Sequence, residues 1–106
     1  MKVKLENREY ELKATGRFLL KYKEVFNENA MMALYKVAQD RDALECAKLI
    51  YCGINETMPF EEWLDSFESP LFILPVMDSV LEYMLRSTKP TVDNSTPSNG
   101  GEKKTN

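Results

Sequence analysis

The segment RDALECAKLIYCGIN, residues 41–55, is the most apolar helical pattern in the chain. As a helix, it carries apolar side chains from Leu44 to Ile54 around most of its circumference. Its polar side chains form one narrow stripe of Arg41, Glu45, Lys48 and Asn55. A helix with so little polar surface must be covered by neighbours on several sides, so this one is predicted to be the central helix of the domain. Asp40 is expected to cap it, with Asp42 in the first turn, where a carboxylate favours the helix dipole.

Two amphipathic helices are predicted before the central one, in RFLLKYKEVFNEN at 17–29 and AMMALYKVAQ at 30–39. A break between them is expected at residues 27–29, and both segments have apolar side chains at helical spacing. The side chains expected to face the core are Phe18, Leu19, Tyr22, Val25 and Phe26 in the first helix, and Met31, Leu34, Tyr35 and Ala38 in the second.

Two more helices are predicted after the central one. The triplet at 57–59, TMP, is typical of a cap followed by a first-turn proline, and it opens FEEWLDSF at 60–67. Pro75 must fall in a first turn or mark a kink, because a proline inside a helix costs about 3 kcal/mol. The last helix is therefore predicted at 75–87. The side chains expected to be buried are Phe60, Trp63, Leu64 and Phe67 in the first of these helices, and Met77, Val80, Leu81, Met84 and Leu85 in the second.

The N-terminal segment VKLENREYELKA, residues 3–14, alternates apolar and charged residues. This pattern predicts a two-stranded hairpin that turns at Asn7-Arg8 and buries Val3, Leu5, Tyr10 and Leu12 on one face. An isolated hairpin is only marginally stable, so it should lie on the helices. The predicted fold is mainly α (α+β), with an N-terminal β-hairpin docked on a bundle of four to five helices.

The domain is predicted to span residues 1–89, because helical periodicity stops at Pro90. Residues 90–106 are dominated by Ser, Thr, Asn, Gly and Pro. Such a composition buries too little apolar surface to offset the entropy lost on ordering, which predicts a flexible tail. We therefore expect a single helical domain followed by a disordered segment.

The composition argues against an enzyme. The chain contains no His, which removes the usual catalytic triads and His-based metal sites. The pair Glu61/Glu62 and Asp65 lie opposite the aromatic side chains of their helix and are expected to face water. Cys46 and Cys52 are about 9 Å apart along the helix axis, which is too far for a disulfide within that helix. They are therefore expected to be buried thiols. We expect no catalytic site, no metal and no cofactor.

Nucleic acid and membrane partners are also not expected. Residues 57–90 contain two Lys/Arg and six Asp/Glu, so the helix that would read DNA in a helix-turn-helix is acidic and would be repelled by phosphates. No segment has the roughly 18 uncharged apolar residues that a membrane span needs, and the N-terminus does not resemble a signal peptide. The sequence therefore predicts a cytoplasmic protein.

A protein partner remains, and aromatic residues are its candidate contacts. The helix at 60–67 and the link SPLFILP at 69–75 contain more aromatic surface than one helix needs for packing. Trp63 and Phe67 also fit a core, whereas the two side chains in the link are better candidates for exposure. The candidate partner-binding residues are Phe60, Trp63, Phe67, Phe72 and Ile73.

The order of elements resembles the tail assembly chaperones of long-tailed, siphovirus-type bacteriophages. The resemblance covers about residues 2–88 and lies in KLENREYELKA, GRFLLKYKEVF, ALECAKLIYCGIN and TMPFEEWLDSF. It implies a protein that binds the tape measure protein, keeps it soluble until the tail tube forms, and leaves before the virion matures. Many copies on one client would suit weak self-association. The alternatives are another phage or host protein-binding adaptor, and a small helical DNA-binding regulator.

The same resemblance implies a role for the tail. Many such chaperones are made in two forms, the longer one after a ribosomal frameshift near the end of the reading frame, and its extension recruits tube subunits, the major tail protein. Glu102-Lys103-Lys104 can be encoded as GAA AAA AAR, which contains a slippery heptamer. The tail would then be a linker to that extension. An ordinary frayed terminus is the alternative.

Overall fold

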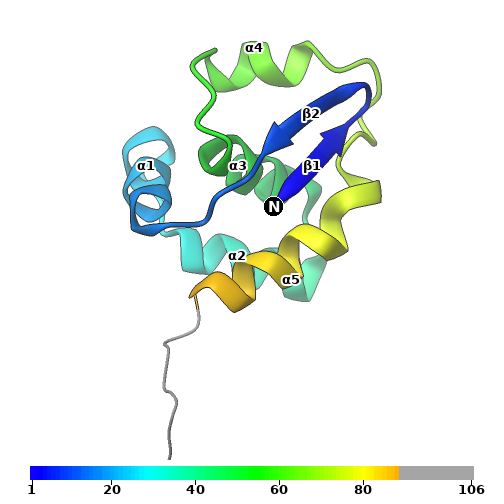
Figure 1. Cartoon of the computed structure of the whole chain (residues 1–106). Coiled ribbons are helices and arrows are strands. Elements are labelled where there is room, and N and C mark those ends of the chain that lie inside the picture. Colours follow the sequence, from blue (N-terminus) through cyan, green and yellow to red (C-terminus); the bar gives the residue numbers. More distant parts are fainter. Residues whose placement is uncertain (89–106) are drawn as a thin grey trace, which may run out of the picture.

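The computed structural model describes residues 1–88. It confirms the mainly α fold with an N-terminal hairpin (Figure 1). The predicted flexible tail at 90–106 and its slippery site lie outside the described residues. The elements are β1 (Lys2–Leu5), β2 (Arg8–Glu11), α1 (Gly16–Phe26), α2 (Ala30–Asp40), α3 (Ala43–Gly53), α4 (Phe60–Asp65), the 3-10 turn η1 (Leu74–Val76) and α5 (Met77–Thr88).

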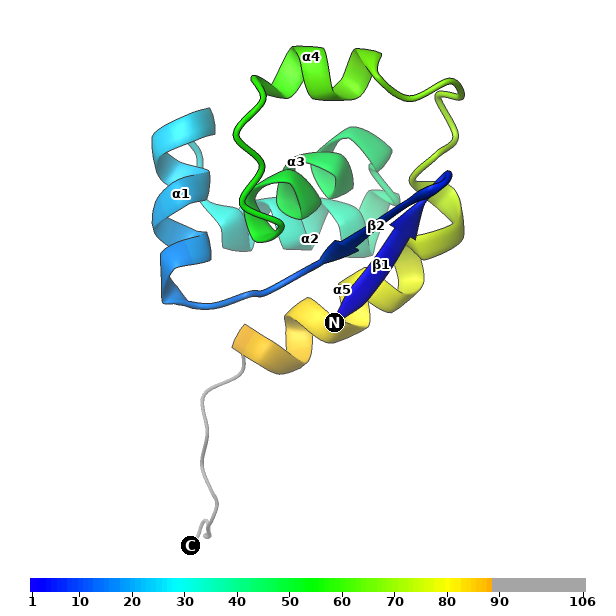
Figure 2. The ribbon, with the colours of Figure 1, turned by 45° about the horizontal axis from the view of Figure 1, so that its top comes forward.

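Helix α3 lies at the centre, as its near-continuous apolar surface predicts. Figure 2 shows it with α1, α4 and the hairpin around it, while α2 and α5 pack on it from below. Its cap differs from the prediction. Asp42, not Asp40, is the N-cap, and its carboxylate accepts a hydrogen bond of 3.1 Å from the backbone N–H of Glu45. Arg41 ends α2 in a left-handed conformation with φ 56°, so α2 and α3 are joined by only two residues.

For two side chains of α3, burial is the reverse of what was expected. Leu44 was expected inside but is 54% exposed, and Glu45 was expected in a polar stripe but is buried. Glu45 is stable there because the hydroxyl of Tyr22 and the ammonium of Lys48 both donate to its carboxylate. A buried carboxylate with two donors is satisfied, whereas Leu44 is left without cover.

Helix α2 buries a different face from the one predicted. Ala30, Ala33, Leu34 and Val37 are buried, whereas Met31, Tyr35 and Ala38 are exposed. Both sets have the spacing i, i+3, i+4, i+7, and they differ by one residue, which is a rotation of about 100°. Small alanines allow α2 and α3 to approach closely, and the larger Met31 and Tyr35 point to solvent. In α1, Phe18 and Tyr22 are buried as predicted, but Leu19 and Val25 are exposed.

The hairpin buries Val3, Leu5 and Leu12 against the helices, as predicted. Its turn is at Glu6-Asn7, one residue earlier than predicted, because Leu5 pairs with Arg8 across the strands. Glu6 adopts the left-handed φ of 58° that a tight turn requires. Its carboxylate then accepts hydrogen bonds from the backbone N–H groups of Glu68 and Ser69, at 2.9–3.1 Å. The turn thereby holds the segment after α4.

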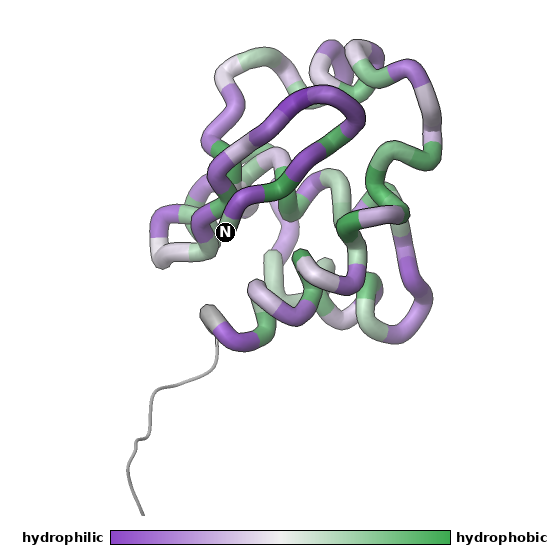
Figure 3. The backbone as a smooth tube through the Cα atoms, turned by 45° about the vertical axis from the view of Figure 1, so that its right-hand side comes forward, coloured by the Kyte–Doolittle hydropathy of each residue, from purple (hydrophilic) through white to green (hydrophobic). Residues whose placement is uncertain are grey.

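The chain from α4 to α5 also departs from the prediction in its details. Helix α4 ends at Asp65, not at residue 67, and Pro75 lies in η1, so α5 begins at Met77. The link between them carries a run of hydrophobic positions, visible as green in Figure 3. In α5, Met77, Val80 and Met84 are buried as predicted, while Leu85 is exposed. No helix between residues 1 and 88 is long and apolar enough to cross a membrane.

Candidate partner-binding groove

Trp63 anchors α4 to the rest of the domain. Its indole is fully buried and contacts rings from three other segments. Ring centroids lie 5.5 Å away for Tyr51 of α3, 6.5 Å for Tyr10 of β2 and 5.9 Å for Phe72 of the link. Offset and edge-to-face rings at these distances add to the energy of burial. Trp63 therefore acts as a core residue, and it was one of the predicted partner-binding candidates.

The indole nitrogen of Trp63 has no hydrogen-bond partner among the described residues. A buried N–H without an acceptor costs about 1–3 kcal/mol. Burial of the aromatic ring outweighs this cost. Trp63, the one buried side chain of α4, therefore holds the helix by apolar contacts, and its indole forms no hydrogen bond among the described residues. Helix α4 also has no side-chain cap, because Pro59 occupies the cap position.

The other aromatic candidates divide between the core and its edge. Phe67 is buried, and Phe72 stacks on it at 4.0 Å while remaining half-buried. The guanidinium of Arg8 lies 4.5 Å from the Phe67 ring, on which it stacks as a cation. Phe60 is half-buried and meets Phe26 edge-to-face at 4.9 Å. Phe60 and Phe72 are thus the two aromatic candidates that keep some surface for a partner.

The expectation that Ile73 is exposed is wrong. Ile73 is 1% exposed, because the link turns after Pro70 and directs this side chain into the core. Its neighbours Leu71 and Leu74 are the exposed apolar residues of the link. A short irregular segment has no fixed period, so the sequence did not reveal which of its four apolar side chains would point inward.

Two hollows lie between α3 and α4, and Leu44 lines both of them. The first, of about 530 Å³, has walls from α1, α3 and α4, including Phe26 and Phe60. The second, of about 510 Å³, lies between α3 and the link, with walls that include Phe67 and Phe72. We call this pair of hollows, with Leu44 between them, the Leu44 groove. The lining of the second hollow is mainly apolar, whereas that of the first is about equally polar and apolar. Each hollow is of the size that accepts a large side chain or a ligand.

Carboxylates from α4 and the residues after it line both hollows. Glu61 and Glu62 border the first, and Asp65 and Glu68 border the second. All four residues are exposed, and none forms a salt bridge within residues 1–88. The groove therefore combines a partly apolar interior with a negatively charged rim.

Lys48 also borders the first hollow, but its ammonium is paired with two carboxylates outside α4. Its ammonium is 2.9 Å from Glu28 and 3.2 Å from Glu45. Burial works against the charged form of Lys48, but the hydrogen bonds to these two carboxylates outweigh it and raise the pKa of the lysine. Lys48 thus does not neutralise the carboxylates of α4.

The wall between α1 and α3 is fixed by a buried polar contact. The hydroxyl of Tyr22 donates to Glu45 Oε1 at 3.0 Å. Burial and this hydrogen bond raise the pKa of Tyr22, so the hydroxyl stays protonated and continues to donate. The contact holds α1 beside α3 and keeps Phe26 at the edge of the groove.

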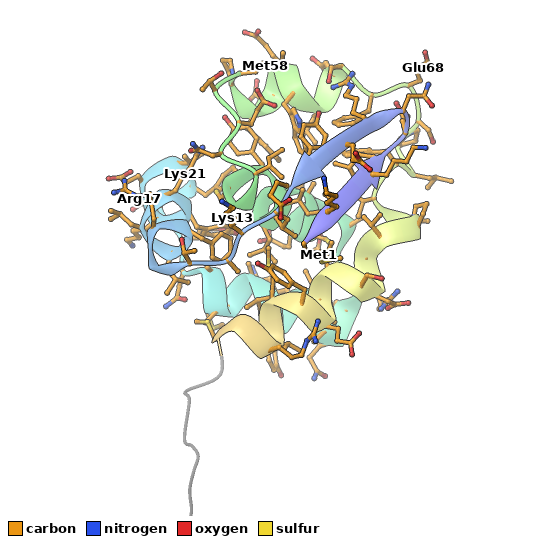
Figure 4. The ribbon with its side chains drawn as sticks, viewed as in Figure 1. Met1, Lys13, Arg17, Lys21, Met58 and Glu68 are labelled. Atoms are coloured by element: carbon orange, nitrogen blue, oxygen red, sulfur yellow. The ribbon has the colours of Figure 1, made fainter. Side chains whose placement is uncertain are left out.

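A third hollow, of about 360 Å³, lies beside α1 and has a different character. Lys13, Arg17 and Lys21 line it. Figure 4 shows them below Met58 and Glu68, which flank α4. Lys21 donates to Asn55 Oδ1 and to the carbonyl of Glu56, both at 3.1 Å. Positive side chains therefore gather beside α1, while negative ones gather on α4.

Two kinds of reactive group, metal ligands and thiols, can be assessed in the part of the chain that the structure describes. No three His, Cys, Asp or Glu side chains there are placed to hold a metal ion. Cys46 and Cys52 are free and buried, as predicted, and burial raises the pKa of each thiol to about 12. Thiols that stay protonated at neutral pH are poor nucleophiles.

Leu44 and Val25 line this groove and are exposed, although both were expected in the core. The sequence contained a signal for Leu44, because this residue is three positions after Arg41 and four before Lys48 and so lies on the polar side of α3.

Comparison with known proteins finds no matching family model, curated protein or solved structure. Functional inference therefore depends on the chemistry of the groove and on the resemblance in element order.

Proposed function

We propose that this chain is a tail assembly chaperone of a long-tailed bacteriophage. It binds helical segments of the tape measure protein in the Leu44 groove and keeps them soluble in the host cytoplasm until the tail tube forms. It is not an enzyme, and it leaves before the virion is mature. The order of hairpin and helices, which resembles that family over residues 2–88, supports this proposal.

The observation that carries the proposal is the Leu44 groove itself. Leu44 is 54% exposed and lines both hollows, where the fold gains little from a leucine. Apolar grooves between helices are a common binding site for the apolar face of an amphipathic helix. A long helical client offers many such faces, so many weakly bound copies can cover it together.

The tail adds a second part to the proposal. A frameshift at Glu102-Lys103-Lys104 would give a longer product whose extension recruits the major tail protein, with residues 90–106 as the linker. The coding DNA tests this part directly. An AAG codon at Lys103, or a GAG codon at Glu102, would remove the slippery heptamer and contradict the frameshift.

Co-expression with the tape measure protein tests the chaperone function. Wild type is compared with Leu44→Glu and with the matched control Leu20→Glu. Leu20 is also 54% exposed and also lies in a helix, but it does not line the groove. We expect wild type and Leu20→Glu to keep the client soluble, and Leu44→Glu to leave it in the pellet.

Two results would count against the proposal in different ways. A client that is equally insoluble with and without the wild-type chain would contradict the chaperone function. A client that Leu44→Glu keeps as soluble as wild type does would show that the groove is not the binding site. A groove that instead binds another protein of the same phage or its host would make the chain an adaptor.

A further inference from the structure

We infer that the occupant of the Leu44 groove is a basic amphipathic helix that lies across Leu44. One apolar side chain enters each hollow, and Lys or Arg side chains beside them face the carboxylates of α4. The inference depends on the proposed function only in taking a helical segment of a protein client as the ligand. It adds the sequence pattern by which the client segments are recognised.

The shape of the groove favours a helix over an extended strand. Its walls come from α1, α3, α4 and the link, and no residue of β1 or β2 lines either hollow. Addition of a strand needs a free sheet edge, which these walls do not offer. A helix needs only a hydrophobic channel, and its apolar side chains at i, i+3, i+4 and i+7 share one face.

The position of Leu44 sets how that helix must be patterned. Because Leu44 lines both hollows, an occupant that fills both must place apolar side chains on either side of it. Side chains at i and i+7 of a helix are about 10 Å apart along the axis, and residues i+3 and i+4 lie between them. We therefore assign the outer pair to the two hollows and the side chains between them to Leu44.

The charge of the rim selects the sign of the flanking residues. Glu61 and Glu62 border one hollow, and Asp65 and Glu68 border the other, so each end of the occupant meets two carboxylates. Lys48 is paired with Glu28 and Glu45 and does not compensate them. An acidic helix would be repelled at both ends, whereas a basic helix would be attracted at both.

The carboxylates of α4 do not all benefit the free protein. Glu61 and Glu62 suit the N-terminus of α4, but Asp65 is at its C-terminus, where the helix dipole disfavours negative charge. Glu61 and Asp65 are also spaced i, i+4, at which like charges repel across one turn. The free helix therefore gains from Glu61 and Glu62 but not from Asp65, whose charge a basic partner would offset.

Three labelled peptides of about 20 residues test the inference by fluorescence anisotropy with the full chain. The first has Leu at the groove-facing positions and Lys beside them, the second replaces each Lys with Glu, and the third has the composition of the first in scrambled order. In about 0.1 M salt, we expect the first to bind about tenfold more tightly than the other two.

Two variants identify the source of that preference. The neutralised variant Glu61→Gln, Glu62→Gln, Asp65→Asn, Glu68→Gln should lose the preference for Lys over Glu while still binding both peptides. Leu44→Glu should weaken the first peptide about tenfold or more, and Leu20→Glu should leave it unchanged. Raising the salt to about 1 M should shrink the Lys preference, because the Debye length falls to about 3 Å.

Equal binding of the Lys and Glu peptides by wild type would overturn the inference. Equal binding of the scrambled Lys peptide would overturn it too, because binding would then depend on charge without helical pattern. Either result leaves the chaperone proposal standing if Leu44→Glu still fails to keep the client soluble. Conversely, a client that stays insoluble with wild type contradicts the chaperone proposal whatever the peptides do.

Discussion

Helices α3 and α4 form the two sides of the groove, and they differ in length, capping and number of buried residues. Helix α3 has eleven residues, a side-chain cap from Asp42, and eight buried residues. Helix α4 has six residues, no side-chain cap, and one buried residue, Trp63. The difference shows how one small domain combines a stable core with an open apolar surface. Helix α3 places almost all its apolar surface inside, and α4 leaves the space above Leu44 uncovered.

The largest predicted effect is the loss of the anchor of α4. Trp63→Ala should lower the free energy of unfolding by about 3–5 kcal/mol, because it removes a buried indole that contacts five other rings. Urea unfolding followed by circular dichroism measures it. Trp63→Phe should cost much less, because it keeps an aromatic ring and removes the N–H that has no partner among the described residues. A Trp63→Ala variant within about 1 kcal/mol of wild type would contradict the anchoring role.

The thiols of α3 predict a loss of stability in alkali. Burial raises the pKa of Cys46 and Cys52 to about 12, from an ordinary value near 9. Above pH 9 the unfolded chain therefore ionises its thiols while the folded chain keeps them protonated, so unfolding releases protons. The free energy of unfolding should fall as pH rises from 9 to 12, by at most about 1.4 kcal/mol per thiol and pH unit.

Urea unfolding at pH 8, 9 and 10 measures this slope. The double variant Cys46→Ala, Cys52→Ala is the control, and its unfolding free energy should change less between pH 9 and 10 than that of wild type. Burial also raises the pKa of Tyr22 and Tyr51, and these two tyrosines add to the loss only above about pH 10. If the unfolding free energy of wild type and of the double variant fell equally with pH, the thiols of α3 would not be buried as the structure shows.

The polar contact between α1 and α3 should have an intermediate effect. Tyr22→Phe removes the hydroxyl that donates to the buried Glu45 and should cost about 1.5 kcal/mol, part of the loss being offset because Lys48 still pairs with that carboxylate. Tyr35→Phe is the matched control, because Tyr35 is exposed, and it should change stability by less than about 0.5 kcal/mol. Urea midpoints compare the two. Equal midpoints for both variants would mean that the Tyr22 hydroxyl does not stabilise the wall of the groove.

The smallest predicted effect is the sharpest test of the contrast within α3. Leu44→Ala should change the free energy of unfolding by about 0.5 kcal/mol or less, because the side chain is more than half exposed. Leu49→Ala, one turn and a half along the same helix, should cost about 2–5 kcal/mol, because Leu49 is buried. Thermal unfolding of the pair measures the difference. A similar loss for both would show that Leu44 is part of the core.

Hydrophobic periodicity was enough to predict most of the fold. The alternation of Val3, Leu5 and Leu12 gave the buried face of the hairpin, and the apolar surface of residues 43–53 gave the central helix. These predictions succeed because burial follows directly from a local repeat. The same reasoning failed for α2, where two faces have equal spacing and the close approach of α3 selects the one with alanines.

The site was harder to predict than the fold, because it depends on which apolar residues the fold leaves uncovered. Four of the five candidates, Phe60, Phe67, Phe72 and Ile73, line the groove, but Phe67 and Ile73 are buried in its wall, and Trp63 is a core residue that does not line it. Leu44 was taken for a core residue, although its place between Arg41 and Lys48 indicated the polar side of α3. An uncovered leucine is a property of tertiary packing, and no local pattern reports how far α4 reaches over α3.

Hydrogen exchange of the full chain, alone and with the proposed tape measure client, shows whether the client occupies the Leu44 groove. In the free chain, amides of α4 should exchange much faster than those of α3, because α4 is short and anchored by one side chain. When the client binds, backbone amides at residues 43–48 and 60–73 should exchange more slowly, and those of the hairpin at 2–11 should not change. Slower exchange on the outer face of α2, around Met31 and Tyr35, with no change beside Leu44, would contradict it.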